Sequence, residues 1–353
     1  SPIKITRLSI ESETVSCKVW KPLEKKVDGE TGRRGDSENI LSLNTETNIQ
    51  NGRVAILILN YMGTQDTIAS VQSLLKSSYQ KFEIIVIDND SPNISFRELI
   101  QCLGDRTILR SPKNLGYAGG NNLGIEYVKD KGFEFIWVLN PDTTVEETTL
   151  ERLVYAANKR KDISIYGSTI CWSHRPDTVW FGGGAVKLTE QQCQTYHMYS
   201  GQDKSLVPEQ IYDVDYVTGA SIFCRTHVFN ELGLIPERYF LYFEETDWCL
   251  QARQRGHRIA VVPDSVLYHS KRSQVDVLPT KIYFYYYIRG SVLFMLKYFS
   301  QNAVLVENSI SEKFIQPWLQ RIREKAPKQA EYFAALAQQA LRDGFNNITG
   351  SVD

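Results

Sequence analysis

An unbroken run of six apolar residues opens the regular part of this chain, Val54-Ala55-Ile56-Leu57-Ile58-Leu59. A run without polar alternation is typical of a strand that is buried on both faces, as strands in parallel sheets are. Further mostly apolar segments follow at 82–87, 107–109 and 135–139. We therefore expect four buried strands in the first half of the chain.

Stretches with helical periodicity separate these strands. Residues 66–76 place Ile68, Val71, Leu74 and Leu75 on one stripe, which is typical of an amphipathic helix. Further helices are expected over 96–103, 121–130 and 147–159. The alternation of strand and helix predicts an α/β fold with a mostly parallel central sheet and helices on both faces.

The sequence divides into three predicted parts. Residues 1–51 read as an N-terminal extension or linker, with strands expected near 3–5 and 15–20 and a polar stretch over 24–50. Residues 52–300 form the main domain, in which a regular half of about 52–160 precedes a mixed half of about 161–275. Residues 301–353 form a C-terminal helical segment with two amphipathic helices.

Composition excludes several classes of protein. A net charge of −1 gives no sign of a nucleic-acid surface. Six cysteines without a CxxC pair argue against a zinc site or a disulfide framework and favour a reducing compartment. No apolar run is long enough to span a membrane. Residues 281–300 come nearest, but Arg289 and Lys297 interrupt them, so we expect a buried helix there rather than a membrane-surface helix.

Polar residues follow the predicted strands, at the edge where an open parallel sheet binds ligands. These ends are Asn60-Tyr61, Asp88-Asn89-Asp90 and Asn140-Pro141-Asp142. The third strand leads into a glycine-rich segment over 114–122. This segment does not match the G-x-G-x-x-G fingerprint, but its glycines allow the backbone to approach a ligand before a helix that opens at Asn121.

Three carboxylates lie within four positions at the start of a helix expected over Thr246 to Arg255: Glu244, Glu245 and Asp247. Carboxylates this close repel one another, so a fold tends to keep them together where a metal, a substrate hydroxyl or a proton needs them. An acidic first turn that favours the helix dipole is the structural alternative.

A candidate cation site combines Asp142 and His269. A carboxylate at a strand end can place one ligand for Mg²⁺ or Mn²⁺, and magnesium prefers few protein ligands, with substrate phosphates and waters completing the shell. His269 would add a nitrogen ligand, unless it is a satisfied core or surface residue.

Together these motifs resemble glycosyltransferase family 2, the inverting nucleotide-sugar enzymes of the GT-A fold, and within it a rhamnosyltransferase-like branch. The resemblance covers about 54–299, with further support from 262–269 and 285–289. Its motifs are Ile58-Leu59-Asn60-Tyr61, Val86-Ile87-Asp88-Asn89, the glycine-rich segment 114–122, Leu139-Asn140-Pro141-Asp142, Gly219-Ala220 and Tyr242-Phe243-Glu244-Glu245-Thr246-Asp247.

The resemblance implies roles for these residues. Residues 52–160 become the donor half and 161–275 the acceptor half. The catalytic base is Glu245, with Glu244 and Asp247 orienting neighbours or binding acceptor hydroxyls. The cation ligands are Asp142 and His269. The implied donor-binding residues are Asn60, Tyr61, Asp88, Asn114, Gly116, Tyr117, Gly120, Asn121, Asn140 and Arg289. The implied acceptor-binding residues are Gly219, Ala220 and Tyr242.

The chain departs from the family pattern at three points. Asn140-Pro141-Asp142 offers one carboxylate where the usual D-x-D motif offers two. Glu245 is one methylene longer than the usual aspartate. Arg289-Gly290 stands where the family carries Arg-Asn, and Arg289 would either serve the diphosphate or pack the C-terminal helix.

The implied activity is transfer of rhamnose from TDP-rhamnose to a hydroxyl of a glycan or lipid-linked glycan in bacterial surface polysaccharide assembly. A UDP-sugar-dependent transferase and a non-catalytic sugar- or nucleotide-binding module are the alternatives. A nucleotidyltransferase is disfavoured, because Asn60-Tyr61-Met62-Gly63 lacks a basic residue directly after the first strand. The expected location is the cytoplasm, in solution or peripherally at the inner membrane, in a chain that belongs to a longer multidomain protein.

Overall fold

The structure is a computed structural model that describes residues 4–6, 52–104, 106–189, 192–270 and 278–352. The strand predicted over 15–20 and the linker over 24–50 lie outside the described residues. The strand predicted near 3–5 corresponds to β1. In the described part of the chain, every helix is too short or too polar to cross a bilayer.

The described elements alternate between strand and helix in the first half of the chain, as predicted. The strands are β1 Lys4–Thr6, β2 Val54–Asn60, β3 Phe82–Asp88, β4 Thr107–Arg110, β5 Phe135–Leu139, β6 Thr143–Val145, β7 Ile165–Trp172, β8 Arg175–Phe181, β9 Gly184–Thr189, β10 Gln192–His197, β11 Tyr212–Asp213, β12 Ser221–Arg225 and β13 Ile259–His269. The α-helices are α1 Thr64–Leu74, α2 Asn93–Leu103, α3 Gly116–Val128, α4 Thr149–Lys159, α5 His227–Leu232, α6 Glu244–Gln254, α7 Lys281–Tyr298, α8 Ala303–Ile310, α9 Gln316–Lys325 and α10 Ala330–Phe345.

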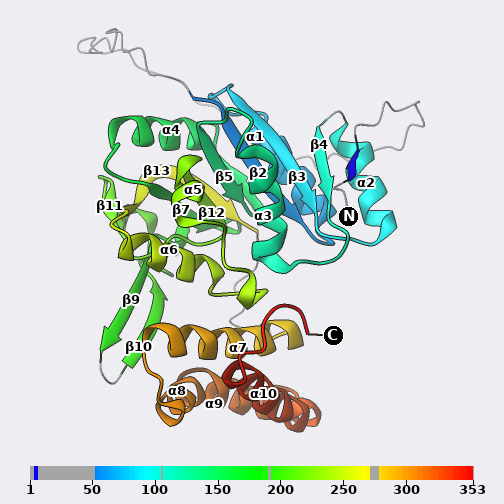
Figure 1. Ribbon diagram of the computed structural model, residues 1–353, viewed down its shortest axis with the longest axis vertical. Coiled ribbons are helices and arrows are strands. Elements are labelled where there is room, and N and C mark those ends of the chain that lie inside the picture. The colour runs from blue at the N-terminus through cyan, green and yellow to red at the C-terminus, as the bar shows by residue number, and fades with distance from the viewer. Residues whose placement is uncertain (1–3, 7–51, 105, 190–191, 271–277, 353) are drawn as a thin grey trace, which may run out of the picture.

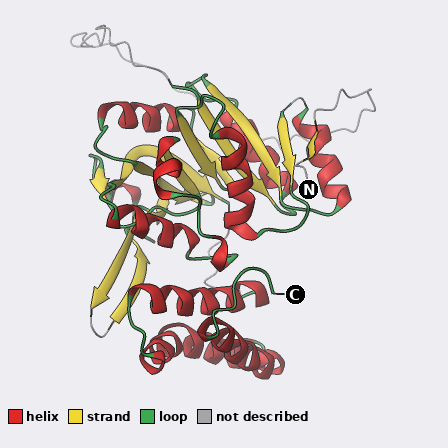
Figure 2. Ribbon diagram, in the orientation of Figure 1, coloured by secondary structure: helices red, strands yellow, loops and turns green. Residues whose placement is uncertain are grey.

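One large twisted sheet organises the molecule (Figures 1 and 2). Its strand order is β1-β4-β3-β2-β5-β12-β7-β13-β11, and β9 and β10 form a separate hairpin. The β4-β3-β2-β5 unit is parallel, and so is the β7–β13 pair. The residues of β5 and almost all of β2 are buried, because the sheet is covered on both faces. The predicted α/β fold with a mostly parallel sheet is confirmed.

The antiparallel strand β12 between β5 and β7 brings two parts of the sequence to one edge. Ser221 pairs with Leu139, so the start of β12 lies at the carboxyl end of β5. The N–H of Asn140 accordingly donates to the carbonyl of Ala220 at 3.1 Å. Gly219 and Ala220 therefore join the ligand-binding edge although they precede their strand.

Four helices begin earlier than the sequence predicts, and two of them, α3 and α6, carry predicted site residues. Helix α3 starts at Gly116 rather than at Asn121, so the glycine-rich segment is mostly helix and not loop. Helix α6 starts at Glu244 rather than at Thr246. In both cases the preceding chain is fixed by tertiary contacts that local periodicity does not report, and the two glutamates consequently lie in the first turn of α6.

The C-terminal helices form a second core below the sheet (Figure 1). Helix α7, predicted as a buried helix, has most of its residues buried, and its apolar side chains pack with those of α8, α9 and α10. The same core includes Tyr239 and Phe240, which lie just before the acidic helix α6. The predicted domain boundaries stay predictions.

Candidate active site

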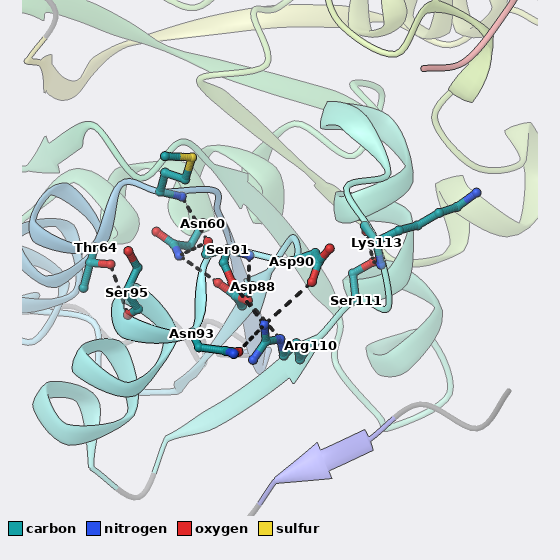
Figure 3. Close-up of polar contacts among 11 residues, drawn as sticks. Asn60, Thr64, Asp88, Asp90, Ser91, Asn93, Ser95, Arg110, Ser111 and Lys113 are labelled. Carbon is teal, nitrogen blue, oxygen red and sulfur yellow. Dashed lines mark hydrogen bonds and ion pairs between the residues drawn. The ribbon is translucent and has the colours of Figure 1, made fainter. Parts of the chain in front are cut away.

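The polar ends of β2 and β3 form a buried network (Figure 3). Asn60 Nδ2 donates to Asp88 Oδ1 at 3.0 Å and to Ser91 Oγ at 3.2 Å. The N–H of Ser91 donates to Asp88 Oδ2 at 3.2 Å. Both Asn60 and Asp88 are fully buried, whereas Tyr61 is 47% exposed. Asn60 therefore shapes this end of the site through Asp88, while Tyr61 faces outward.

Sequence reasoning missed Arg110, which joins this network. Arg110 Nε lies 3.6 Å from Asp88 Oδ2, and its Nη2 lies 3.7 Å from Asp90 Oδ1 and donates to the carbonyl of Ser91 at 3.0 Å. The signal was present, because Arg110 is the last residue of β4 and so belongs to the same carboxyl edge. The guanidinium of Arg110 beside the carboxylates of Asp88 and Asp90 gives this end of the site both donors and acceptors for a polar ligand.

The glycine-rich segment is fixed to β3 by paired side-chain amides. Asn114 Oδ1 accepts from Asn89 Nδ2 and from the N–H of Gly116, each at 2.9 Å. Asn121 is fully buried, and its Nδ2 donates to the carbonyl of Tyr117 at 3.0 Å. A side chain on Gly120 would collide with Leu59, so this helix packs closely on β2.

Gly116 and Tyr117 connect the two halves of the site. Gly116 has φ +72°, and a Cβ there would lie 2.3 Å from the carbonyl oxygen of Phe240. The N–H of Tyr117 donates to that same oxygen at 2.8 Å. The Tyr117 hydroxyl donates to the carbonyl of Gly219 at 2.6 Å. The predicted donor segment thus contacts both the loop before α6 and the predicted acceptor residue Gly219.

The two predicted cation ligands meet at the same edge. His269 Nε2 lies 3.5 Å from Asp142 Oδ1, and the two side chains are 3% and 11% exposed. Strand pairing explains the meeting, because His269 pairs with Thr143 directly after Asp142. One carboxylate and one imidazole suit Mn²⁺ or Mg²⁺ if phosphate oxygens and waters fill the remaining positions. Among the described residues, no group of three or more such ligands gathers anywhere.

Glu244 and Glu245 occupy the first turn of α6 after a backbone of unusual conformation. Tyr242 and Phe243 have φ of +69° and +73°, values that are rare for residues with bulky side chains. Glu244 is 4% exposed, and its Oε2 has no hydrogen-bond partner among the described residues. Glu245 is half-buried and therefore reaches the surface of the site.

Both glutamates are held in an environment that disfavours their charge. Burial, and then the neighbouring carboxylate of Glu245, raise the pKa of Glu244 well above its ordinary value. Burial also raises the pKa of Glu245, although backbone hydrogen bonds from Glu245 itself, Gly219 and Thr246 oppose this shift. Glu245 therefore lies beside Gly219, in surroundings that favour uptake of a proton by its carboxylate.

Asp247 and Arg289 lie in the core rather than with the other predicted site residues. The Asp247 carboxylate accepts from the side chains of Tyr239, Gln251, Lys297 and Tyr298. Arg289 is fully buried, and its Nη2 donates to the carbonyl of Tyr239 at 2.8 Å. The structure thus brings together seven of the predicted site residues at or near one edge of the sheet: Asp88, Asn114, Asn140, Asp142, Gly219, Glu245 and His269. Asp247 and Arg289 are instead buried beneath the loop that precedes Glu244.

Comparisons with known proteins identify similar glycosyltransferases. Residues 55–199 match the family model described as glycosyl transferase family 2. The chain is 25% identical to the low-salt glycan biosynthesis hexosyltransferase Agl10 of Haloferax volcanii, over 84% of this chain and 92% of that protein. It is 26% identical to the rhamnosyltransferase WbbL of Escherichia coli K12, over 60% of this chain and 80% of that protein.

A solved structure supports the fold. The chain resembles GalNAc-T7, crystallised with UDP, GalNAc and Mn²⁺, with a TM-score of 0.54 and 16% sequence identity. The similarity covers 84% of this chain and 55% of the GalNAc-T7 chain, so this chain spans about half the length of that structure.

Proposed function

The chain belongs to glycosyltransferase family 2, and on that basis we propose that it is an inverting, metal-dependent transferase of a sugar from a nucleoside diphosphate to a hydroxyl group. The proposal rests on two groups of residues that lie at one edge of the sheet, a candidate cation site and a candidate base. Asp142 and His269 lie 3.5 Å apart at the ends of their strands. Glu245 lies beside Gly219, which is adjacent to that edge through Ala220 and Asn140.

The proposed mechanism begins with the base. Glu245 takes the proton of the acceptor hydroxyl, which then attacks the anomeric carbon from the face opposite the leaving group. Burial raises the pKa of Glu245, which makes its carboxylate a stronger base than that of an exposed glutamate. The transition state carries charge resembling an oxocarbenium ion, as in glycoside cleavage.

The diphosphate leaving group would be held at the candidate cation site. Asp142 and His269 would bind Mg²⁺ or Mn²⁺, and a bound cation would balance the charge of the departing diphosphate. Asp88 and Arg110 would hold the nucleoside, because together they present acceptors and donors at the end of the buried β2–β3 network. The segment from Asn114 to Asn121 would line the pocket between these two groups.

TDP-rhamnose is the proposed donor, and a glycan or lipid-linked glycan of a bacterial surface polysaccharide the proposed acceptor. The similarity to WbbL, a rhamnosyltransferase, supports rhamnose. A transferase that uses a UDP sugar is the second candidate, because the name of Agl10 specifies transfer of a hexose but no particular sugar. We also propose a location in the cytoplasm, with peripheral contact with the inner membrane.

Turnover with a panel of sugar nucleotides tests the proposal. TDP-rhamnose, UDP-galactofuranose and UDP-N-acetylglucosamine would each be incubated with Mn²⁺ and lipid-linked glycan extracts, and release of the nucleoside diphosphate would be measured. The proposal predicts release from TDP-rhamnose and a product of inverted anomeric configuration by NMR. Release from a UDP sugar alone would select the second candidate, and a retained configuration would contradict the mechanism.

A further inference from the structure

Two tryptophans and two histidines form a continuous aromatic surface, which we call the aromatic wall: Trp172, Trp180, His197 and His269. Trp180 stacks on His269 with ring centroids 4.4 Å apart and an interplanar angle of 25°. Trp172 meets His269 edge-on at 6.2 Å. His197 meets Trp180 edge-on at 5.4 Å. The four rings come from β7, β8, β10 and β13, so the wall is built by the fold and not by one local motif.

One end of the wall lies at the candidate cation site. Trp172 and His269 are register partners at the carboxyl ends of the parallel strands β7 and β13. The His269 ring that supports Trp180 is the same ring whose Nε2 lies 3.5 Å from Asp142. A group bound by Asp142 and His269 would therefore be adjacent to the indole of Trp180.

The other end of the wall leads toward the candidate base. The ring of His197 lies 6.5 Å from that of Tyr216. Tyr216 precedes Gly219, the residue beside Glu245, by three positions. The wall thus extends from the candidate cation site toward the segment that leads to Gly219.

The wall is only partly covered by protein. Trp172, Trp180 and His197 are partly exposed, whereas Phe181 and Tyr216 behind them are 0% and 3% exposed. Indole rings that are not fully buried, beside polar groups with fixed positions, are typical of sites for ligands that have both apolar and polar faces. A sugar ring is such a ligand, since its C–H face can stack on an indole while its hydroxyls point to the rim.

We propose that the aromatic wall binds the transferred sugar of the donor, with Trp180 as the main stacking partner and Trp172 beside it. The anomeric carbon must lie next to the leaving phosphate, and the wall begins beside Asp142 and His269, which would hold the cation on that phosphate. The inference rests on the proposed function and adds the residues that recognise the sugar as distinct from its nucleotide.

The test compares each sugar nucleotide with its own nucleoside diphosphate. Calorimetry with Mn²⁺ would give Kd values for TDP-rhamnose and TDP, for UDP-galactofuranose and UDP, and for UDP-N-acetylglucosamine and UDP. In the wild-type protein, the cognate sugar nucleotide should bind tighter than its diphosphate. Trp180→Ala should reduce this advantage about tenfold, in line with the typical strength of ring stacking on an aromatic side chain. Trp180→Phe should retain most of the advantage, and Trp172→Ala should reduce it less.

The diphosphate is the internal control for a purely structural role. If Trp180 only supports His269, Trp180→Ala weakens the diphosphate and the sugar nucleotide by the same factor, and their ratio stays constant. A constant ratio would overturn the inference, as would a wild-type protein that binds the diphosphate and the sugar nucleotide equally.

A tryptophan outside the site provides a matched control. Trp318 in α9 packs against the C-terminal core, so Trp318→Ala should leave the ratio unchanged. Trp180→Phe covers the case in which Trp180→Ala does not fold. If the wild-type protein binds no nucleotide of the panel, the proposed function itself fails, which is a different result from a constant ratio.

Discussion

Lys297 Nζ lies 2.6 Å from Asp247 Oδ1, and this ion pair joins the C-terminal helix α7 to the acidic helix α6. Asp247 is fully buried, while the Lys297 side chain is 33% exposed. Tyr239 and Tyr298 donate to the same carboxylate. Because Glu245 lies two residues before Asp247, the C-terminal helices contribute to the placement of the candidate base.

Lys297→Met should destabilise the protein. The buried Asp247 would lose its charged partner but keep neutral donors, so we expect a loss of about 1.5–3 kcal/mol, typical of a hydrogen bond to a charged group. Lys313→Met, at an exposed position on the same C-terminal segment, should change stability by less than about 0.5 kcal/mol. Urea denaturation measures both changes. Equal losses of stability would show that the ion pair of Lys297 with Asp247 stabilises the fold no more than an exposed lysine does.

Gly116→Ala should disrupt the connection between the donor segment and the loop before α6. The added methyl would meet the Phe240 carbonyl at 2.3 Å, in a backbone conformation with φ +72°. Gly132 is a matched control, because it has φ +73° and nothing within 4 Å of the added Cβ. We expect about 1–2 kcal/mol of backbone strain in both variants and a further loss only at Gly116. Comparable melting temperatures for the two variants would contradict the proposed close approach.

Glu245→Gln should lower turnover about 10²–10⁴-fold, the usual contribution of a general base. Donor binding should change little, because the proposed partner of the side chain is the acceptor hydroxyl and not the nucleotide. Glu245→Asp, the shorter carboxylate that the family usually carries, is the conservative control and should retain far more activity than the glutamine variant. A loss below tenfold in Glu245→Gln would remove Glu245 from the role of base.

Glu244→Gln should stabilise the protein in a pH-dependent way. The pKa of Glu244 is raised in the folded state, so the folded protein holds this proton more tightly than the unfolded chain does. Stability is therefore lost as the pH rises from the ordinary range of a glutamate through the raised folded pKa. The glutamine keeps the shape without the charge, so its advantage over wild type should grow with pH. Denaturation at pH 5, 6, 7 and 8 checks this trend, and an advantage that shrinks with pH would contradict it.

Local pattern was sufficient to predict the sheet and its ligand-binding edge. The strands β2, β3, β4 and β5 appear in the sequence as mostly apolar segments, and the polar residues after them identify Asn60, Asp88 and Asp142. The meeting of Asp142 with His269 was also expected, although 127 positions separate them, because both followed predicted strands or family motifs.

Contacts between distant segments set the limits of that prediction. The four side chains around Asp247 come from η2 (Glu237–Tyr239), α6 and α7, and no local pattern indicates that an acidic residue in a helix turn is buried. The early start of α3 depends on the close approach of Gly116 to Phe240. The aromatic wall likewise depends on the pairing of β7 with β13, which places Trp172 beside His269.

Nucleotide binding with and without metal tests the central claim most directly. Melting temperatures of the wild type and Asp142→Asn would be measured with TDP, UDP, GDP and CDP, each with and without Mn²⁺. A ligand that binds only the folded state at 100 times its Kd stabilises by about 2.7 kcal/mol. The account predicts that TDP raises the melting temperature, that Mn²⁺ enlarges the shift, and that Asp142→Asn abolishes the metal-dependent part. No shift with any nucleotide under either condition would contradict the assignment of a nucleotide-sugar transferase.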